Sequence, residues 1–494
     1  MSAAPALPEV RWLAPARLTA GLDRRRRLDL AAHRSVHPLP PHPSRDDLLA
    51  LAERVDLRGR GGAGFPFARK ARAALAASDR SGARPVVVVN GAEGEPPSAK
   101  DAMLLARVPH LVLDGACAAA AAFGAEEIVI GVAAGGPGED SVTAALAERE
   151  NDLPCPARLV CLPERFVSGE SSALIRGVNG LAVLPGTVRA RAADGGPGGV
   201  RRRPTLLSNA ETWAQLALVV RLGADAYRAA GSAAEPGTVL LTVNRPAAGP
   251  LVVEVPAGTA MGPVLEACGT PAGEGVLVGG YHGAWLPGRD AVGAPLSRAG
   301  LAGLGGTFGA GAVVALPGDT CPLGEIARVA AWLAGESAGQ CGPCRRGLPD
   351  AADALAALAA GAAGPAVPAQ VRSALGAARG GGACSHPDGT ARFVLTALDV
   401  FAEDVAAHVS GPGCGRPVLG VLPLPRERGP RLEVDWSRCA GHGLCAVVAP
   451  GLVRLGPHGY PASTSMPVVP WQRHAARQAV SQCPALALRL DRRG

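Results

Sequence analysis

Short apolar runs rich in β-branched residues alternate with segments of helical periodicity between residues 46 and 235, and this alternation constrains the fold most. The runs are "PVVVVNG" (85–91), "EIVIGVA" (127–133) and "RLVCLP" (158–163). Each run leads through glycine or proline into a helix-like segment. Continuous apolar runs that alternate with helices are typical of the strands of a parallel sheet, because helices cover both faces of the sheet. The sequence therefore predicts an α/β sandwich with buried strands.

The rest of the chain changes character several times, as expected of 494 residues, which are too many for one ordinary core. Strand-like runs follow the sandwich, and an Ala- and Leu-rich stretch with helical spacing comes after them. We predict a multi-domain α/β protein. Its expected parts are an irregular Pro- and Arg-rich segment (1–45), the α/β sandwich (46–235), a compact, mainly β domain (236–318), a helical bundle (319–412), an extended Pro/Gly linker (413–430) and a C-terminal α+β domain with a strand at each end (431–494).

Composition excludes several classes of function. The net charge of +7 is small for this length, and the basic runs 23–29 and 201–203 lack interleaved aromatic residues. We therefore expect no nucleic-acid partner. The apolar runs are too short to span a bilayer, and the N-terminus lacks the apolar core of a signal peptide. The expected location is cytoplasmic, with any membrane association supplied by a partner.

Twelve cysteines in a reducing compartment favour metal or redox use of the clustered ones over a disulfide framework. The scattered cysteines are expected to be small buried hydrophobic residues. These are Cys117, Cys155, Cys161, Cys268 and Cys321.

The C-terminal part contains the clearest site. It reads Cys439-x-x-His442-x-x-Cys445, and Cys483-Pro484 follows 38 residues after Cys445. Closely spaced thiolates joined by a distant Cys-Pro are typical of an iron–sulfur cluster. Two cysteines, a histidine and a third cysteine also form a closed tetrahedral set for zinc, which is the competing interpretation.

A second site is indicated near the front, in "LRGRGGAGFPFARK" (57–70). Glycines at 59, 61, 62 and 64 let the backbone approach a phosphate closely and direct N–H groups at it, while Arg60 and Lys70 add charge. Taken alone, a glycine-rich turn in a glycine-rich protein explains the loop equally well.

Polar residues elsewhere strengthen the binding interpretation. Asn90, Glu93 and Glu95 follow a buried strand directly, where α/β folds bind ligands. The segments "FVSGESSALI" (166–175) and "LLSNAETWA" (206–214) add polar groups at further element ends. Both lysines of the chain, Lys70 and Lys100, fall within segments 57–70 and 86–101, a placement that composition does not explain.

A third site is indicated in "ESAGQCGPCRRG" (336–347), which holds Cys341 and Cys344. Two cysteines at this spacing fit a metal site, a redox dithiol or a turn that happens to contain cysteines.

In "GRGGAGFP", "ExEP" and "ESxGxCxPCRxG", residues 46–412 resemble the NADH-oxidising flavoprotein subunit of respiratory complex I and its relatives in NAD-linked hydrogenases and formate dehydrogenases. The resemblance implies an FMN domain, a β-grasp-like (SLBB) domain and a helical iron–sulfur domain.

Residues 431–494 resemble small single-cluster bacterial ferredoxins. In these proteins a missing middle cysteine usually gives a three-iron cluster. The cluster type here, 3Fe-4S or 4Fe-4S, stays open, as does ligation by His442.

The resemblance also implies roles for particular residues. Glu93 and Glu95 would face the nicotinamide nucleotide, where hydride transfer takes place. Cofactor-binding positions would be Gly59, Arg60, Gly61, Gly62, Gly64, Phe65, Lys70, Asn90, Gly169, Glu170, Asn209 and Thr212. Metal ligands would be Cys341, Cys344 and Cys384 at one site and Cys439, Cys445, Cys483 and His442 at the other.

Three departures from the family pattern concern nucleotide binding. The family stacks adenine between phenylalanines, and Phe65 matches one of them, but Ala73 and Arg201 stand at the other positions. Ser171 replaces the second glutamate of "GEE". One hypothesis is that Arg201–Arg203 bind a phosphorylated nucleotide such as NADPH, because guanidinium pairs bidentately with phosphate. The alternative is a solvated arginine loop.

A further departure is Ala338, which stands where the family has the first of its closely spaced cysteines. Three interpretations follow. The site holds a three-iron cluster on three cysteines, or a four-iron cluster with His386, Ser337 or water as fourth ligand, or no iron and a dithiol.

These expectations combine into one function. Electrons would enter FMN as a hydride from NAD(P)H, pass through Cys341, Cys344 and Cys384 to the fused ferredoxin, and leave to a monooxygenase, a reductase or a membrane haem protein. The alternative is an electron-transfer module without enzymatic activity that has lost nucleotide binding. A zinc-stabilised scaffold is the third possibility.

Overall fold

The computed structural model describes residues 7–38, 42–186, 190–246, 248–362, 364–425, 430–468 and 472–491. The chain divides into two compact units, Met1–Pro423 and Leu424–Gly494. Each unit is described by itself below.

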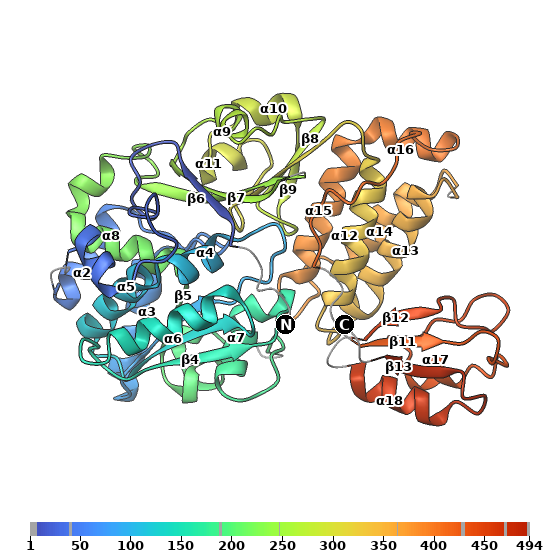
Figure 1. The fold of residues 1–494 in the computed structure, drawn as a ribbon, viewed down its shortest axis with the longest axis horizontal. Helices are drawn as coiled ribbons and strands as arrows, with labels where there is room; N and C mark the ends of the chain where they lie inside the picture. The colour runs from blue at the N-terminus through green and yellow to red at the C-terminus, as the bar shows by residue number, and fades with distance from the viewer. Residues whose placement is uncertain are drawn as a thin grey trace. The chain divides into compact units, whose positions relative to one another are not determined.

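The first unit contains a four-stranded sheet in the order β4-β3-β2-β5, in which every neighbouring pair is parallel (Figure 1). Its strands are β2 (Val86–Gly91), β3 (Glu127–Ala133), β4 (Ala157–Leu162) and β5 (Thr205–Asn209). Alternate residues of β2 enter different cores, since Val87 and Val89 pack with the helices on one face and Val86 and Val88 with those on the other. The apolar runs form parallel strands as predicted, and β2 and β3 are buried. The prediction of burial is wrong for β4, which is half-buried because it lies at the edge of the sheet.

Helices cover both faces of this sheet. Helices α5 and α8 contribute Leu111 and Trp213 to one core, and α7 contributes Leu174 and Ile175 to the other. The helices of this domain are α2 (Arg45–Arg54), α3 (Phe67–Ser81), α4 (Lys100–Arg107), α5 (Pro109–Phe123), α6 (Pro137–Glu148), α7 (Ser171–Val178) and α8 (Ala210–Arg228).

A second, six-stranded sheet of mixed direction has the order β1-β7-β6-β10-β8-β9. Strands β1 and β7 are parallel, as are β6 and β10, and the other pairs are antiparallel. Its strands are β1 (Glu9–Trp12), β6 (Thr238–Arg245), β7 (Gly249–Pro256), β8 (Gly275–Val278), β9 (Ala284–Pro287) and β10 (Ala312–Leu316), with helices α9 (Met261–Ala267), α10 (Gly288–Gly293) and α11 (Arg298–Ala302).

The prediction that residues 1–45 are irregular is wrong for two elements. Strand β1 extends the six-stranded sheet, and helix α1 (Leu30–Val36) follows it. The intervening chain is fixed by the buried carboxylate of Glu254, which accepts the backbone N–H groups of Arg17, Leu18 and Thr19. These contacts join residues more than 230 positions apart, so no local pattern announces them.

The Ala- and Leu-rich stretch is helical, as predicted. Its apolar positions recur at helical spacing, and Leu333, Leu355, Leu358, Leu375 and Leu398 are buried. The helices are α12 (Pro322–Glu336), α13 (Leu348–Ala359), α14 (Val367–Ala378), α15 (His386–Val400) and α16 (Ala402–Ser410), with the π-helical turn η5 (Pro343–Gly347) before α13.

The expected extended linker is in part a docked segment. Its first half packs on the start of α12, where the buried Glu325 carboxylate accepts backbone N–H groups from Gly420 and Leu422. Leu422 is fully buried, and the Pro423 carbonyl accepts the hydroxyl of Tyr281. The segment thus belongs to the first unit as far as Pro423; residues 426–429 of the predicted linker lie outside the described residues.

The second unit holds a three-stranded antiparallel sheet in the order β12-β11-β13. Leu432 and Val434 of the central strand share a core with Val453, Ala476 and Ala479. The elements are β11 (Arg431–Val434), α17 (Leu444–Val448), β12 (Ser465–Pro467), α18 (Arg473–Gln482) and β13 (Leu488–Asp491).

In the described part of the chain, no single helix has the length and apolar character needed to cross a membrane. Helices α4 and α5 meet those criteria only as a pair, and the pair is bent by 93°.

Candidate functional site: the glycine loop and the cysteine groups

The glycine-rich loop is a closed turn that leads into α3. The Gly59 N–H donates to the Phe65 carbonyl at 2.9 Å, and the Phe67 N–H donates to the Leu57 carbonyl at 2.8 Å. Gly62 and Gly64 have φ of +110° and +60°, and a Cβ on Gly64 would lie 2.8 Å from Nε of Arg298. Only glycine therefore fits at position 64.

The tip of this loop offers unpaired backbone donors. Within the described residues, the N–H groups of 61–64 donate to no acceptor of the chain. Gly61, Gly62 and Ala63 are exposed, and helix α3 begins three residues after Gly64. Exposed N–H groups before a helix N-terminus are the donors that a phosphate requires, so the loop fits the phosphate of FMN.

Two asparagines end neighbouring strands beside this loop. Asn90 of β2 and Asn209 of β5 are register partners at the carboxyl edge of the sheet. The Arg60 N–H donates to Asn209 Oδ1 at 3.2 Å and to Thr212 Oγ1 at 2.9 Å, which holds the loop against this edge. Asn90 Nδ2 donates to the Gly169 carbonyl at 2.9 Å. The structure thus brings these predicted binding residues together.

A buried ionic group holds the Asn209 side chain in place. Asp101 accepts the Asn209 amide at 2.9 Å and the Glu211 N–H at 2.8 Å, and it pairs with Lys100 Nζ at 3.0 Å. Glu211 lies 2.9 Å from the same ammonium. Sequence reasoning missed Asp101 because two of its partners, Asn209 and Glu211, are more than 100 residues away, and it noted Lys100 only for its rarity.

The two cationic residues of the glycine segment differ in role. Lys70 Nζ donates to the Leu207 carbonyl at 2.9 Å, beside the end of β5, and burial lowers the pKa of Lys70. Arg60 is buried, and its guanidinium is turned toward the Tyr227 hydroxyl. Arg60 therefore contributes its backbone N–H to the loop, while the prediction that its side chain adds charge there is not supported.

The carboxyl groups of Glu93 and Glu95 are held by the protein. Glu93 accepts the Ser98 hydroxyl at 2.5 Å and the Ala102 N–H at 2.9 Å, and burial raises its pKa. Glu95 accepts the Tyr281 N–H at 2.6 Å, and burial raises its pKa to about 8. A Cβ on Gly280 would lie 2.7 Å from the Glu95 carboxyl carbon, so glycine is required where the six-stranded sheet meets this loop.

Glu170 acts locally as a helix cap. Its carboxylate accepts the N–H groups of Ser172 and Ala173, both at 2.9 Å, at the start of α7. Its charge also contributes to raising the pKa of the Cys384 thiol, after the larger effect of burial.

The structure gives no support to a phosphate-binding role for Arg201–Arg203 at this site. These residues precede β5 and lie at the amino edge of the sheet, opposite Asn90 and Asn209. Arg201 and Arg203 contact Glu127 and Glu126, at 3.5 and 3.8 Å. At the glycine loop itself, Phe65 is 41% exposed and Arg69 lies over its ring, 5.5 Å from the ring centre.

The three cysteines of the helical domain come together. Burial opposes ionisation of Cys341, but backbone hydrogen bonding from Cys344 and Ala383 lowers the pKa of its thiol. Cys344 lies in the π-helical turn, and burial with the neighbouring Cys341 raises its pKa to about 12. Cys384 contributes to the same effect. Among the described residues these sulfurs do not all lie within 4.8 Å, so the group is wider than a site for one ion and fits three thiolates on a cluster.

The proposal that His386 is a fourth ligand is wrong in this structure. Its Nε2 lies 2.9 Å from the Leu333 carbonyl and its Nδ1 lies 3.1 Å from His282 Nε2. Both ring nitrogens are therefore engaged away from the thiols. Ser337 is buried, and its carbonyl faces Arg165.

The cysteines of the second unit also converge. Cys439, Cys445 and Cys483 all pack against the core of this unit, and Cys439 and Cys483 both contribute, after burial, to the raised pKa of Cys445. The Ala487 N–H donates to Cys483 Sγ at 3.4 Å. His442 is exposed between Gly441 and Gly443, whose φ values are +70° and +71°. Three thiolates therefore fit a cluster here, with His442 at the rim of the loop.

Of the five scattered cysteines, Cys268 and Cys321 are buried as predicted, whereas Cys117 and Cys155 are half-buried. Cys161 is exposed rather than buried, because it occupies the outer strand β4. Cys321 is buried but lies with His408 and Cys414 in a compact group. Sequence reasoning missed this group because its members are 87 and 6 residues apart and match no ligand spacing.

Family models match three parts of the chain. Residues 52–218 match the Nuo51 FMN-binding domain, residues 325–408 match the NADH-ubiquinone oxidoreductase-F iron-sulfur binding region, and residues 432–490 match a 4Fe-4S single cluster domain.

Relatives agree with these matches. A subunit of the NADH-quinone oxidoreductase of Streptomyces coelicolor is 27% identical over 396 residues, which are 75% of this chain and 84% of that protein. One of the corresponding subunits of Rhizobium meliloti is 30% identical over 320 residues, 61% of this chain and 73% of that protein. The NADP-reducing hydrogenase subunit HndC of Solidesulfovibrio fructosivorans is 26% identical over 427 residues, 82% and 83% of the two chains.

A solved structure resembles the fold as well. A chain of the NAD+-reducing [NiFe]-hydrogenase in the air-oxidised state matches with a TM-score of 0.70 and 27% identity, over 82% of this chain and 69% of that chain. The likeness extends through the mixed α/β architecture described above.

Proposed function

The chain belongs to the family of NADH-quinone oxidoreductase subunits that carry the Nuo51 FMN-binding domain, and from that premise we propose that it oxidises NAD(P)H with FMN and passes the electrons to iron–sulfur clusters. FMN and iron–sulfur clusters are the cofactors of this oxidoreductase family. The nucleotide preference, the path through the fused C-terminal unit and the final acceptor are parts of the proposal.

One observation carries the proposal. The N–H of Arg60 in the glycine loop is bonded to Asn209 at the end of β5, next to Asn90 at the end of β2. A phosphate-binding loop and two amide side chains therefore share the carboxyl edge of a parallel sheet, where such folds bind ligands. We assign the loop N–H groups and Lys70 to the FMN phosphate and ring, and Asn90, Asn209 and Thr212 to its polar edge.

FMN, when bound, takes two electrons with a hydride and releases them singly, and the protein supplies binding, orientation and electrostatics. With its pKa near 8, Glu95 is largely protonated at pH 7. A neutral carboxyl group beside the site repels an anionic dinucleotide less than a carboxylate does.

The route onward is short in the fold. Asn90 Nδ2 donates to the Gly169 carbonyl, and the charge of Glu170, the next residue, contributes to the raised pKa of Cys384. Phe166, at the start of the same turn, donates its N–H to Glu336 at 2.9 Å, near the end of the helix that precedes Cys341. This continuity supports Cys341, Cys344 and Cys384 as the first cluster site.

We extend the proposal to the remaining parts. The six-stranded domain is assigned as the SLBB (β-grasp-like) domain, and residues 431–494 as a ferredoxin with a cluster on Cys439, Cys445 and Cys483. Covalent fusion raises the effective concentration of this acceptor at the first cluster. A partner protein, such as a monooxygenase, a reductase or a membrane haem protein, receives the electrons.

A second function is favoured by the adenine side of the site. Ala73 is packed against the core, and Arg201 lies at the opposite edge of the sheet, so Phe65 is the one family stacking position that keeps an aromatic ring. With stacking reduced in this way, the protein would be an electron-transfer module that exchanges electrons with protein partners and does not oxidise nucleotides.

Anaerobic stopped-flow spectroscopy of the full chain loaded with FMN distinguishes the two. Bleaching of the flavin by NADH or NADPH supports the enzyme, and bleaching by dithionite alone supports the electron-transfer module. Asn209→Ala should bind FMN at least tenfold more weakly, whereas the exposed Asn151→Ala is the matched control. Purified wild-type protein that binds no FMN would contradict both proposed functions.

A further inference from the structure

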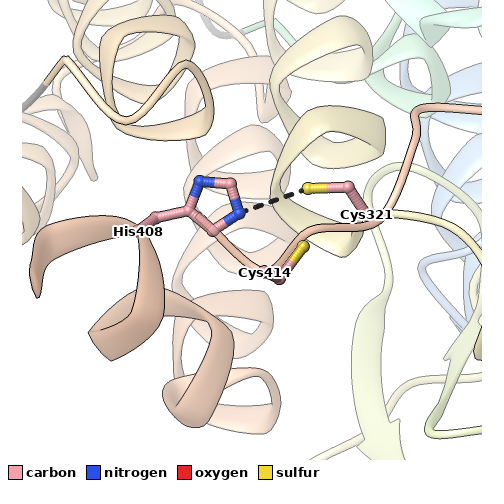
Figure 2. Close-up of side chains that lie close together, drawn as sticks. All are labelled: Cys321, His408 and Cys414. Carbon is pink, nitrogen blue, oxygen red and sulfur yellow. Dashed lines mark hydrogen bonds between the residues drawn. The ribbon is translucent and has the colours of Figure 1, made fainter. Parts of the chain in front are cut away.

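Three side chains that lie outside the predicted sites converge in the helical domain. The ligand atoms of Cys321, His408 and Cys414 all lie within 4.8 Å of one another, and Cys321 and His408 are buried (Figure 2). Cys321 Sγ lies 3.5 Å from His408 Nε2. Cys321 caps the start of α12, His408 is in the last turn of α16, and Cys414 follows in the docked segment. Among the described residues, this is the one group of ligand atoms with the spacing of a single-ion site.

The surroundings set these atoms up as ligands. His408 Nδ1 lies 3.2 Å from the Leu358 carbonyl, which accepts its proton and leaves Nε2 with a lone pair directed at the sulfurs. This second hydrogen bond is the usual partner of a metal-binding histidine. Cys321 Sγ accepts the Gly324 N–H at 3.4 Å, which fixes the position of this sulfur at the start of α12.

The backbone is shaped for this approach. Gly413 has φ of +101°, and a Cβ there would lie 2.8 Å from His408 Cε1. Any other residue would push the following cysteine away from the imidazole. Neither Cys321 nor Cys414 falls in the segment that matches the iron–sulfur binding region, which spans 325–408.

We propose that Cys321, His408 and Cys414 bind a zinc ion, with the fourth position taken by water. Two thiolates and one imidazole suit zinc, which accepts both donor types in tetrahedral geometry. On binding, zinc replaces the thiol protons, which are released to solvent. A Cys321–Cys414 disulfide is the competing use of the two sulfurs, but it gives no role to an imidazole with a preset tautomer.

The zinc site has a structural consequence where the chain leaves the bundle. The Cys321 N–H donates to the Pro417 carbonyl at 2.7 Å, and Thr320 donates its hydroxyl to the same oxygen at 3.2 Å. A zinc ion bound by both Cys321 and Cys414 adds a second link between the start of α12 and this segment. It thereby anchors segment 414–422, which leads toward the second unit, to the start of α12. The site uses none of the flavin or cluster residues and stands apart from the proposed function.

Metal analysis of the full chain, purified without oxygen and dialysed after addition of Zn²⁺, tests the proposal. We expect about one zinc per chain, with X-ray absorption showing two sulfurs at ~2.3 Å and nitrogen or oxygen ligands at ~2.0–2.1 Å. Cys414→Ala and His408→Gln should each lose this zinc while keeping their iron. Cys268→Ala, which removes a buried thiol from another domain, is the matched control and should keep it.

Three results would overturn the proposal. They are wild-type protein that retains no zinc, zinc content unchanged in both variants, and a peptide mass showing a Cys321–Cys414 disulfide in oxygen-free protein. If the variants do not fold, alkylation of the wild type decides. Zinc should protect Cys321 and Cys414 from iodoacetamide and a chelator should expose them, and equal labelling in both conditions refutes the site.

Discussion

The buried ionic group under Asn209 offers the sharpest test of how the flavin site is supported, through Asp101→Ala. The change removes a carboxylate that is 7% exposed and accepts bonds from Asn209 and Glu211 while pairing with Lys100. Lys100, 1% exposed, keeps Glu211 at 2.9 Å as its remaining partner. The backbone N–H of Glu211 and the Asn209 amide lose their acceptor in a buried environment.

The expected loss of stability follows from these contacts. Removing one partner of a buried ion pair costs about 3–5 kcal/mol, and the low end applies because Glu211 stays in place. At an unfolding entropy of about 2.1 cal/mol/K per residue, a loss of about 3 kcal/mol lowers the melting temperature of a unit of 423 residues by roughly 3 °C. Asn209 also loses its fixed orientation, so the Kd for FMN should rise about tenfold, the equivalent of ~1.4 kcal/mol.

Calorimetry of the full chain and fluorescence titration with FMN measure the two effects. Asp225→Ala is the matched control. It also removes an aspartate from an ion pair, but Asp225 is 91% exposed. We expect no measurable change from the control. An Asp101→Ala protein that melts and binds FMN like Asp225→Ala would refute the reasoning that a buried ionic group holds Asn209.

Further predictions concern the cluster site and Glu95. Ala338→Cys should raise the iron content at the first cluster site and convert a three-iron signal in low-temperature electron paramagnetic resonance to a four-iron one; an unchanged spectrum contradicts the three-thiolate assignment. His386→Gln should leave the iron and sulfide content within about 10% of wild type, since both ring nitrogens are used elsewhere, whereas Cys384→Ser should lower it; equal losses would restore His386 as a ligand. Burial raises the pKa of Glu95 from 4.5 to about 8, so the folded state holds a proton that the unfolded state releases, and stability falls as pH rises through this window. Glu95→Gln should remove that part of the slope, so that its melting temperature gains on wild type between pH 5 and pH 8; parallel curves would show that Glu95 is ionised in the folded protein.

Local patterns were sufficient where the physical cause is local. The β-branched runs became β2 and β3 because strands buried on both faces must be apolar at nearly every position, and the third run became the half-buried edge strand β4. The Ala- and Leu-rich spacing gave helices α12–α16 for a similar reason. The glycine loop was also recognisable, since positive φ and close approach select glycine at fixed positions.

Features that depend on distant partners were missed or misjudged. The segment that forms β1 was expected to be irregular. Its neighbouring residues do not reveal the strand, because the order of this part of the chain depends on β7 and Glu254, which are distant in sequence. His386 was considered a ligand from its nearness to Cys384 in sequence, yet its ring is held by Leu333 and His282. Arg201 was considered a nucleotide-binding residue from its position in the loop before β5. Only the direction of β5 shows that Arg201 lies at the edge of the sheet opposite Asn90 and Asn209.

The amino-acid sequence by itself determined the kinds of element, the glycine loop and the thiolate spacings, because each of these is encoded within a few neighbouring residues. Only the tertiary structure decided which groups meet: Asp101 with Asn209, Asn90 with Gly169, and Cys321 with His408 and Cys414. The physical reason is that hydrogen bonds and metal ligation act over a few ångströms in space. Separation along the chain places no limit on such contacts once the cores have packed.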